Sequence, residues 1–293
     1  MSLTQTEASD LFRRPPDRYL PLRDRAEIAL RTVGTGPDVL FVHGWPVSGA
    51  TFRQLLPHLV DHVTCHVIDM PGVGSSRFAA TTPLSIDMHI ESVRATIDQL
   101  GLDQVAVVGH DSGGLIARHA VAGDPRLRGL GLIDTEQSTG LSWRFKSFIS
   151  ARHAPGLGAG LGWVSGRPRV RRNQFVFGGA FHDRSLLDGE FDEFFLTPLH
   201  ESKERRAAAA RLMRSFERRH LDAMSELHAR IDVPVQLVWG EHDIFFPVDW
   251  ARTMVGSFRD ARLEVVAGAG LFSHEERPAE VAAALLPTLL GTR

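Results

Sequence analysis

Short apolar runs alternate along this chain with longer stretches in which apolar positions recur at helical spacing. Near-continuous Val, Ile and Leu runs are typical of strands buried on both faces of a parallel sheet. We expect helices at Ile86–Leu100 and at 113–123, and strands at 28–33, 39–42, 63–68, 105–108, 129–133, 235–239 and 263–266. The pattern predicts an α/β fold with a mostly parallel sheet and helices on both of its faces.

The alternation stops between residues 136 and 228. This stretch contains Gly- and Pro-rich turns and many phenylalanines, and it ends in a helix-favouring segment at 201–227. An insertion of this kind between two strands predicts a helical lid, or cap, over a pocket. We therefore expect a core formed by residues 1–135 and 229–293 and a lid insertion at 136–228, in which most aromatic side chains pack against one another.

Charge and composition exclude several classes of protein. The 293 residues carry a formal net charge of −2, which gives no polyanion-binding signature, so we expect no nucleic-acid partner. No apolar run approaches the ~20 residues of a membrane span, and residues 1–14 are too polar for a signal peptide. We expect no membrane partner and a cytoplasmic location. The single cysteine, Cys65, lies in an apolar run and is expected to be a buried thiol without chemistry.

The segment 105–114, Val-Ala-Val-Val-Gly-His-Asp-Ser-Gly-Gly, joins a predicted strand to a predicted helix. A sharp strand-to-helix turn needs small residues on both sides, and its middle residue then projects at the edge of the sheet with a helix N-terminus behind it. In the Gly-x-nucleophile-x-Gly frame that residue is Asp111. Ser112 stands one place late, so a serine-hydrolase mechanism would require the turn to shift by one residue. We interpret Asp111 as the nucleophile.

With three further segments in the same order, the chain resembles the α/β-hydrolase superfamily over nearly its whole length. Residues 43–46 (His-Gly-Trp-Pro) are similar to the family's His-Gly-x-Pro loop, and residues 69–76 are similar to its Asp-x-x-Gly-x-Gly-x-Ser segment. Residues 239–243 (Trp-Gly-Glu-His-Asp) resemble the segment that carries the catalytic acid. The resemblance implies an α/β-hydrolase fold, an oxyanion hole formed by the backbone N–H groups of Trp45 and Ser112, and Asp243 as the acid.

A carboxylate in the nucleophile position resembles the epoxide hydrolases and the haloalkane and fluoroacetate dehalogenases, whereas esterases and lipases carry serine there. A carboxylate is ionised at neutral pH and can attack an sp³ carbon without help from a base. The resulting alkyl-enzyme ester is then hydrolysed by water that a His–acid pair activates. The resemblance implies a small apolar substrate, water as co-substrate, and neither a metal nor another cofactor; a homodimer is compatible with the sequence.

The chain departs from the family where the catalytic histidine is expected. In the segment Gly268-Ala269-Gly270-Leu271, Leu271 occupies that position, and leucine cannot transfer a proton. His274 follows three residues later, and we interpret it as a shifted base; the alternative is an enzyme without a base. Asp243 is the preferred acid, and Asp134, at the end of the strand predicted at 129–133, is the alternative.

The substrate type is the least determined feature. Epoxide hydrolases usually carry two lid tyrosines, but the only tyrosine here is Tyr19, and dehalogenases usually place Trp or Arg where this chain has Ser112. The Trp45 form of the His-Gly-x-Pro loop favours an epoxide hydrolase-like activity. The alternatives are a haloalkane or haloacid dehalogenase and a non-hydrolytic protein that has lost its base. We expect the side chains of His43, Trp143 and His182 to line the substrate pocket.

Overall fold

Eight strands form one sheet in the computed structural model, which describes residues 3–137 and 140–292. The order is β1-β2-β4-β3-β5-β6-β7-β8; β2 pairs antiparallel with β1 and β4, and the other neighbours are parallel. The strands are β1 (Arg18–Pro21), β2 (Glu27–Gly34), β3 (Asp38–Val42), β4 (Thr64–Asp69), β5 (Val105–His110), β6 (Leu127–Ile133), β7 (Val235–Gly240) and β8 (Ala261–Val266). The predicted fold class is confirmed. Only β1 had no predicted counterpart, because its four residues bury a single side chain, that of Leu20.

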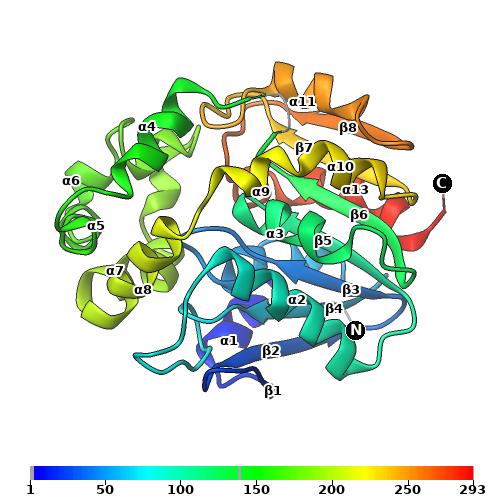
Figure 1. Cartoon of the computed structure of the whole chain (residues 1–293), viewed down its shortest axis with the longest axis horizontal. Helices are drawn as coiled ribbons and strands as arrows, with labels where there is room; N and C mark the ends of the chain where they lie inside the picture. Colours follow the sequence, from blue (N-terminus) through cyan, green and yellow to red (C-terminus); the bar gives the residue numbers. More distant parts are fainter. Residues whose placement is uncertain (1–2, 138–139, 293) are drawn as a thin grey trace.

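Helices cover both faces of this sheet (Figure 1). Helices α2 and α3 pack against each other, and α3 packs on β5, whereas α13 packs on β6 and β7. The helices are α1 (Gln5–Arg13), α2 (Ile86–Leu100), α3 (Ser112–Val121), α4 (Trp143–Ala151), α5 (Leu157–Ser165), α6 (Pro168–Arg171), α7 (Thr197–Glu201), α8 (Lys203–Arg214), α9 (Arg218–Asp222), α10 (Met224–Ala229), α11 (Val248–Val255), α12 (Ser273–Glu276) and α13 (Pro278–Leu290). The layers leave the carboxyl ends of the parallel strands as the edge on which loops meet.

The two hydrophobic cores follow from the two-residue period of the strands. In β3, Leu40 and Val42 join the core shared with α2 and α3, while Val39 and Phe41 join the core shared with α1 and α13. Successive side chains of a strand point to opposite faces, so a strand with helices on both sides must be apolar throughout. Cys65 of β4 is buried in the second core, and burial raises its thiol pKa to about 12.

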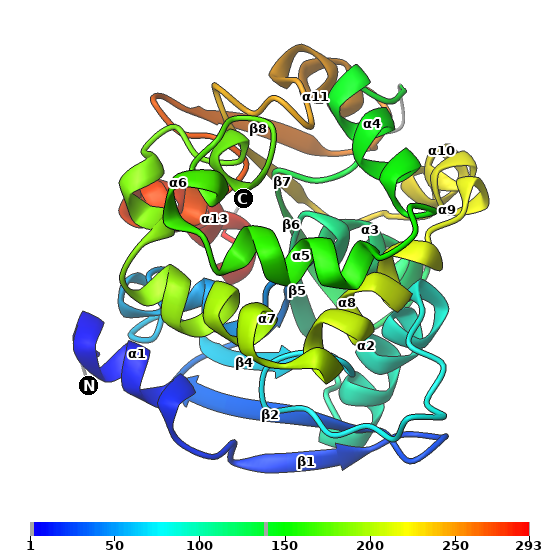
Figure 2. The same ribbon diagram turned by 90° about the vertical axis from the view of Figure 1, so that its left-hand side faces the viewer.

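The stretch between β6 and β7 forms the insertion that we call the β6–β7 insertion, comprising α4 to α10. Its helices α4 to α8 lie to one side of the sheet and cross in front of the strand ends when that side faces the viewer (Figures 1 and 2). The segment predicted to favour helix at 201–227 forms three helices, α8, α9 and α10. Helix α8 ends at Arg214 and α9 ends at Asp222. The short helices α9 and α10 contact each other, and α10 packs against α3 of the core. Residues 138–139 of the expected lid lie outside the described residues.

Candidate active site

Asp111 lies between the end of β5 and the first residue of α3. Its backbone has φ 51° and ψ −134°, a conformation that L-residues rarely adopt. A Cβ built on Gly113 would lie 2.2 Å from the carbonyl oxygen of Val42 and 2.4 Å from that of His43. Helix α3 therefore starts in direct backbone contact with the loop after β3, and the strained residue is held in place by this packing.

The loop after β3 brings both predicted oxyanion donors to the Asp111 carboxylate. The Trp45 backbone N–H donates to Asp111 Oδ2 at 2.8 Å, and the Ser112 hydroxyl lies 3.3 Å from the same oxygen. The loop approaches this closely because Gly44 has no side chain: a Cβ there would lie 2.5 Å from Asp111 Oδ2. The structure thus brings Trp45, Asp111 and Ser112 together as one group.

Burial governs the charge of this group. Asp111 is 9 % exposed, and burial raises its pKa to about 6, although the backbone N–H groups of Ser112 and Trp45 lower it. The pKa still lies below neutrality. Asp111 is therefore mostly ionised at pH 7, and the N–H donors directed at it stabilise the carboxylate form.

Asp243 lies in the turn after β7, close enough to Asp111 for their charges to interact. Its Oδ1 accepts the backbone N–H groups of Phe245 at 2.7 Å and Phe246 at 3.0 Å, whereas Oδ2 is buried and has no partner among the described residues. Burial raises the Asp243 pKa to about 8, with the negative charge of Asp111 as a further cause. Asp243 is therefore predominantly protonated at pH 7, which makes it a proton donor.

Asp134 occupies a different place from Asp243. Its Oδ1 accepts the Gly240 backbone N–H at 2.7 Å, and its Oδ2 accepts the Ser273 hydroxyl at 2.5 Å. Burial, followed by the charge of Asp243, raises the pKa of Asp134 well above its usual value. Both oxygens are thus used to tie the end of β6 to β7 and to the start of α12.

Glu136 is a buried carboxyl group that the sequence motifs did not single out. Burial and the charge of Asp111 together raise its pKa to about 8, although the charge of Arg118 lowers it. The Thr135 hydroxyl lies 3.0 Å from Glu136 Oε2 and 2.7 Å from the Asp111 carbonyl oxygen, and it accepts from Arg118 Nη2 at 2.9 Å. The signal for this network was a charged residue, Arg118, on the otherwise apolar helix after the nucleophile turn.

His110 and His274 are buried and pack against each other. The His110 Nε2 bonds to the Leu271 carbonyl oxygen at 2.9 Å, and its ring lies 4.3 Å from that of His274. His274 Nε2 bonds to the Thr51 hydroxyl at 2.8 Å, and its Nδ1 is buried without a partner among the described residues. Burial, together with His110 and Arg53, lowers the His274 pKa well below its usual value. The role of His274 as the base stays a prediction.

The three expected pocket residues lie in three different environments. His43 is buried, with Nδ1 2.9 Å from the Gly44 carbonyl oxygen and Nε2 accepting the Met70 backbone N–H at 3.0 Å. The His182 ring stacks on that of His242, with centroids 4.5 Å apart. Trp143 is 64 % exposed on α4, where the guanidinium of Arg144 covers its ring. Each of the three already has a partner within the protein, and their pocket role stays a prediction.

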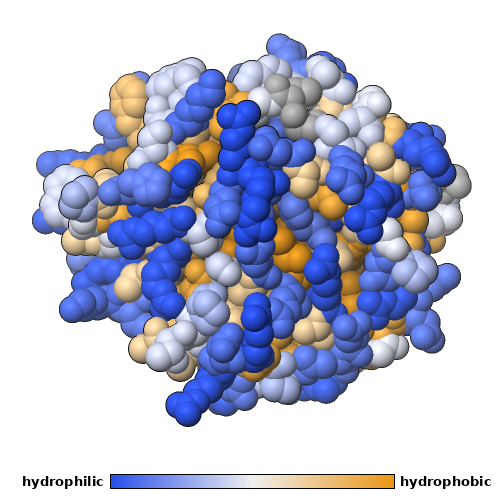
Figure 3. Space-filling model, viewed as in Figure 1, coloured by the Kyte–Doolittle hydropathy of each residue, from blue (hydrophilic) through white to orange (hydrophobic). Residues whose placement is uncertain are grey.

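Within the described residues, no group of three or more His, Cys, Asp or Glu side chains is arranged to hold a metal ion. The same part of the chain contains no helix with the length and apolar character needed to cross a bilayer. On the face in Figure 3, hydrophilic side chains predominate, with hydrophobic ones showing between them.

The model of the alpha/beta hydrolase fold family matches residues 37–278, most of the chain. The chain therefore belongs to the α/β-hydrolase fold family. A solved structure of an α/β hydrolase fold protein from Burkholderia ambifaria is similar, with a TM-score of 0.77 and 22 % identity over 92 % of this chain and 97 % of that one. At that identity the likeness shows the fold alone.

Two curated relatives are named pimeloyl-[acyl-carrier protein] methyl ester esterase. The one from Stenotrophomonas maltophilia is 36 % identical over 104 residues, which is 36 % of this chain and 38 % of the relative. The one from Xanthomonas campestris is 35 % identical over 101 residues, 34 % of this chain and 38 % of the relative. The match thus spans little more than a third of these relatives' length.

These findings correct the activity expected from the sequence. Membership of the hydrolase fold family is confirmed, but an epoxide hydrolase-like enzyme, a dehalogenase and a non-hydrolytic protein are all contradicted, because the curated relatives are ester hydrolases. The error came from letting one position, Asp111, decide the branch of the family. A carboxylate in that place also suits other chemistry when the groups around it supply a proton.

We predict that Gly113→Ala destabilises the protein by about 2 kcal/mol or more, because the added methyl group would overlap two backbone carbonyl groups. Gly160→Ala is the matched control. No heavy atom lies within 4 Å of a Cβ at Gly160 inside α5, so this change should stabilise the helix by up to about 1 kcal/mol. Denaturant unfolding of both variants checks the prediction, and equal effects would contradict it.

A second prediction concerns pH. Because the folded state raises the Asp243 pKa from 3.8 to about 8, it binds this proton more tightly than the unfolded chain does. The free energy of unfolding that depends on this group is therefore largest below pH 3.8 and falls as pH rises to about 8, by up to about 1.4 kcal/mol per pH unit. Asp243→Asn removes this loss.

The variant should gain stability relative to the parent between pH 5 and pH 8, as measured by thermal unfolding across that range. The matched control is Asp249→Asn on α11, whose side chain is 89 % exposed. A stability difference for Asp243→Asn that does not change with pH would show that this carboxyl group is not protonated in the folded protein.

Proposed function

We propose that this chain hydrolyses carboxylic esters, with Asp111 as general base and Asp243 as general acid. The observation that carries the proposal is the pair of buried carboxyl groups in one site, where Asp111 accepts the Trp45 backbone N–H and Asp243 keeps an Oδ2 without a partner among the described residues; their pKa values, about 6 and about 8, agree with this arrangement. Two carboxyl groups whose environments push their pKa values apart divide into a base and an acid between those values. The relatives named as methyl ester esterases support this class of substrate.

Because residue 271 has no side chain that can act as a base, the two carboxyl groups must supply both the base and the acid. In a full triad, an imidazole would accept a proton and pass its other N–H to the buried acid. Here that position is Leu271, and Asp243 Oδ2 has no partner among the described residues.

The reaction follows from these assignments. Ionised Asp111 takes a proton from water as the water oxygen bonds to the ester carbonyl carbon. The carbonyl oxygen becomes negative and accepts hydrogen bonds from the backbone N–H groups of Trp45 and Ser112. In the free protein these two N–H groups are directed at the Asp111 carboxylate. Asp243 protonates the departing alkoxide, so that an acid and an alcohol are formed. Transfer of the proton from Asp111 to Asp243 then restores the starting state.

This mechanism predicts a bell-shaped pH profile. Activity requires Asp111 ionised and Asp243 protonated, so kcat/KM for a short-chain methyl ester should rise through pH 6 and fall through pH 8. A pH-stat assay of acid release measures the profile. A single rising limb that reaches a plateau above pH 8 would exclude Asp243 as the acid.

The substitutions give an independent prediction. Asp111→Asn and Asp243→Asn should each lower kcat roughly 10²–10⁴-fold, the usual contribution of general acid–base catalysis, while Asp249→Asn keeps full activity. Ser112→Ala should retain turnover within a few fold, because only its backbone N–H takes part. Loss of activity in Ser112→Ala with activity retained in Asp111→Asn would assign the nucleophile to the serine hydroxyl.

His274→Ala separates the carboxyl pair from the shifted base. In the described part of the chain, His274 contacts the Thr51 hydroxyl and the rings of His110, Phe52 and Phe272. The carboxyl-pair mechanism therefore predicts little change in kcat for His274→Ala, measured well below the melting temperature. A loss as large as that of Asp111→Asn would assign the base to His274.

A further inference from the structure

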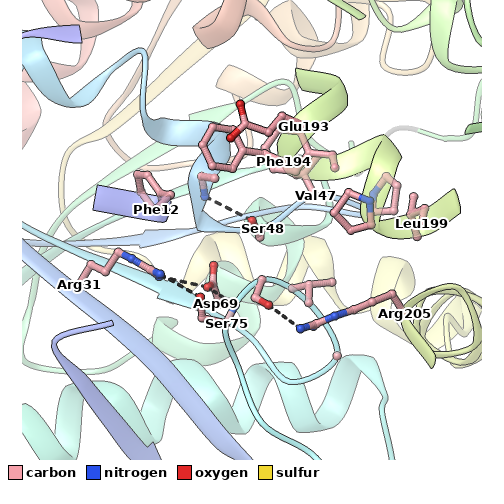
Figure 4. Close-up of a pocket in the computed structure, with 17 residues that line it drawn as sticks. Phe12, Arg31, Val47, Ser48, Asp69, Ser75, Glu193, Phe194, Leu199 and Arg205 are labelled. Atoms are coloured by element: carbon pink, nitrogen blue, oxygen red, sulfur yellow. Dashed lines mark hydrogen bonds and ion pairs between the residues drawn. The ribbon is translucent and has the colours of Figure 1, made fainter. Parts of the chain in front are cut away.

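A cavity of about 260 Å³ lies between parts of the core and of the β6–β7 insertion (Figure 4). The core contributes Phe12, Arg31, Asp69 and the loops at 46–50 and 72–75, and the insertion contributes residues from 193 to 199 and Arg205. Asp111 is not among its lining residues, so the cavity is a separate candidate site.

The two acidic side chains of the lining are already neutralised by hydrogen-bond donors. Asp69 accepts Arg31 Nη1 at 3.2 Å and the backbone N–H groups of Gly49 and Ser75 at 2.8 and 2.7 Å. Glu193 accepts two N–H groups of Arg13 at 2.8 and 2.9 Å. Neither carboxylate is available to bind a cation in the cavity.

Arg205 is the unsatisfied group. Its Nη2 donates to the Gly74 carbonyl oxygen at 2.6 Å, but its Nη1 is buried without a partner, and no carboxylate in the described part of the chain forms an ion pair with it. The other buried arginines that line this side of the protein, Arg31 and Arg53, each have such a carboxylate. The charges of Asp69 and Glu204 act on Arg205 from a distance, but its Nη1 has no hydrogen-bond partner among the described residues, so an anionic guest in the cavity would satisfy it.

Two hydroxyl groups add to the donor character of the cavity. The Ser75 hydroxyl accepts from Arg31 Nη2 at 2.9 Å, and the Ser48 hydroxyl accepts from the Ala50 backbone N–H at 3.4 Å. An accepting hydroxyl still has its own proton to donate. Figure 4 shows the side chain of Arg31 reaching Asp69 and Ser75 from one side, with Arg205 on the opposite side. Such a set of donors suits an oxygen anion.

Apolar side chains line the rest of the cavity: Val47, Phe194, Phe195 and Leu199. A small inorganic anion would make no apolar contacts with this surface. The volume lies below the ~300–1000 Å³ typical of pockets for drug-sized ligands, so the guest must be small. A carboxylate with a short aliphatic chain meets all of these conditions.

We infer that this cavity is a binding site for a small aliphatic monocarboxylate, held by Arg205 at its charged end and by the phenylalanines at its chain. The inference does not depend on the proposed function, because none of its residues takes part in the Asp111 site. The two sites are nevertheless connected by three consecutive residues: Trp45 donates to Asp111, and Pro46 and Val47 line the cavity.

The experiment is a calorimetric titration of the full chain with hexanoate at neutral pH, with hexanamide as the uncharged probe of the same length. Hexanoate should bind and hexanamide should bind at least about tenfold more weakly, because a charge-assisted hydrogen bond is lost. Arg205→Gln should weaken hexanoate binding by a similar factor. Lys203→Gln, which removes an exposed positive charge from the same helix, should leave binding unchanged.

Further variants keep the outcome decisive if Arg205→Gln proves unstable. Val73→Trp, at a partly exposed position of the lining, should fill the cavity and abolish binding, whereas Asp111→Asn should bind hexanoate like the parent. Equal binding of hexanoate and hexanamide, equal weakening by Lys203→Gln, or no hexanoate binding at all would overturn the inference. Loss of binding in Asp111→Asn would place the carboxylate at the nucleophile turn instead and overturn the separate site.

Discussion

The backbone contact between the start of α3 and the loop after β3 is the constraint on which the site depends. Gly113 lies so close to the carbonyl groups of Val42 and His43 that a side chain there would overlap them. In this packing Asp111 has φ 51°, and its carboxylate accepts the Trp45 backbone N–H. The strained backbone of Asp111 thus fixes the position of its carboxylate. Backbone strain of this kind is found where function requires a fixed geometry.

From that placement follows the unusual electrostatics of the site. Asp111, Asp243, Asp134 and Glu136 are all buried, and the pKa of each is raised. What distinguishes Asp111 is the effect of charge. Its pKa is about 6, and its negative charge adds to burial in raising the pKa values of Asp243 and Glu136 to about 8. Burial together with the charge of the neighbouring carboxylate, rather than residue type, decides which carboxyl group holds the proton.

Much of the fold could be predicted from the sequence, because its signals are local. Apolar runs located every strand except β1, and helix α2 has the bounds Ile86–Leu100 that its pattern predicts. The glycines around Asp111 likewise identified the turn, since only small residues permit that approach. The division of the segment 201–227 into three helices was missed, because those breaks depend on packing against the core and not on Gly or Pro.

The site was predictable only in part. Motif spacing placed Trp45, Asp111 and Ser112 together, and the structure shows them in contact. Spacing could not show that both carboxylate oxygens of Asp134 accept hydrogen bonds, one from Gly240 and one from Ser273. It also could not show that Glu136 lies close enough to Asp111 for their charges to interact. Those facts depend on side-chain direction and burial. The substrate class was wrong for a related reason: the identity of one attacking atom does not fix the reaction when the neighbouring proton donors are unknown.

The unpartnered Oδ2 of Asp243 also bears on how this protein is related to α/β hydrolases that carry a complete catalytic triad. An acid that orients an imidazole is of no use for that purpose beside Leu271, yet its turn, its burial and its free lone pair are intact. Two of the leucine codons become histidine codons by one base change. From either of these codons a single substitution would place an imidazole at position 271, in a fold that already holds a buried carboxyl group with an unpartnered oxygen.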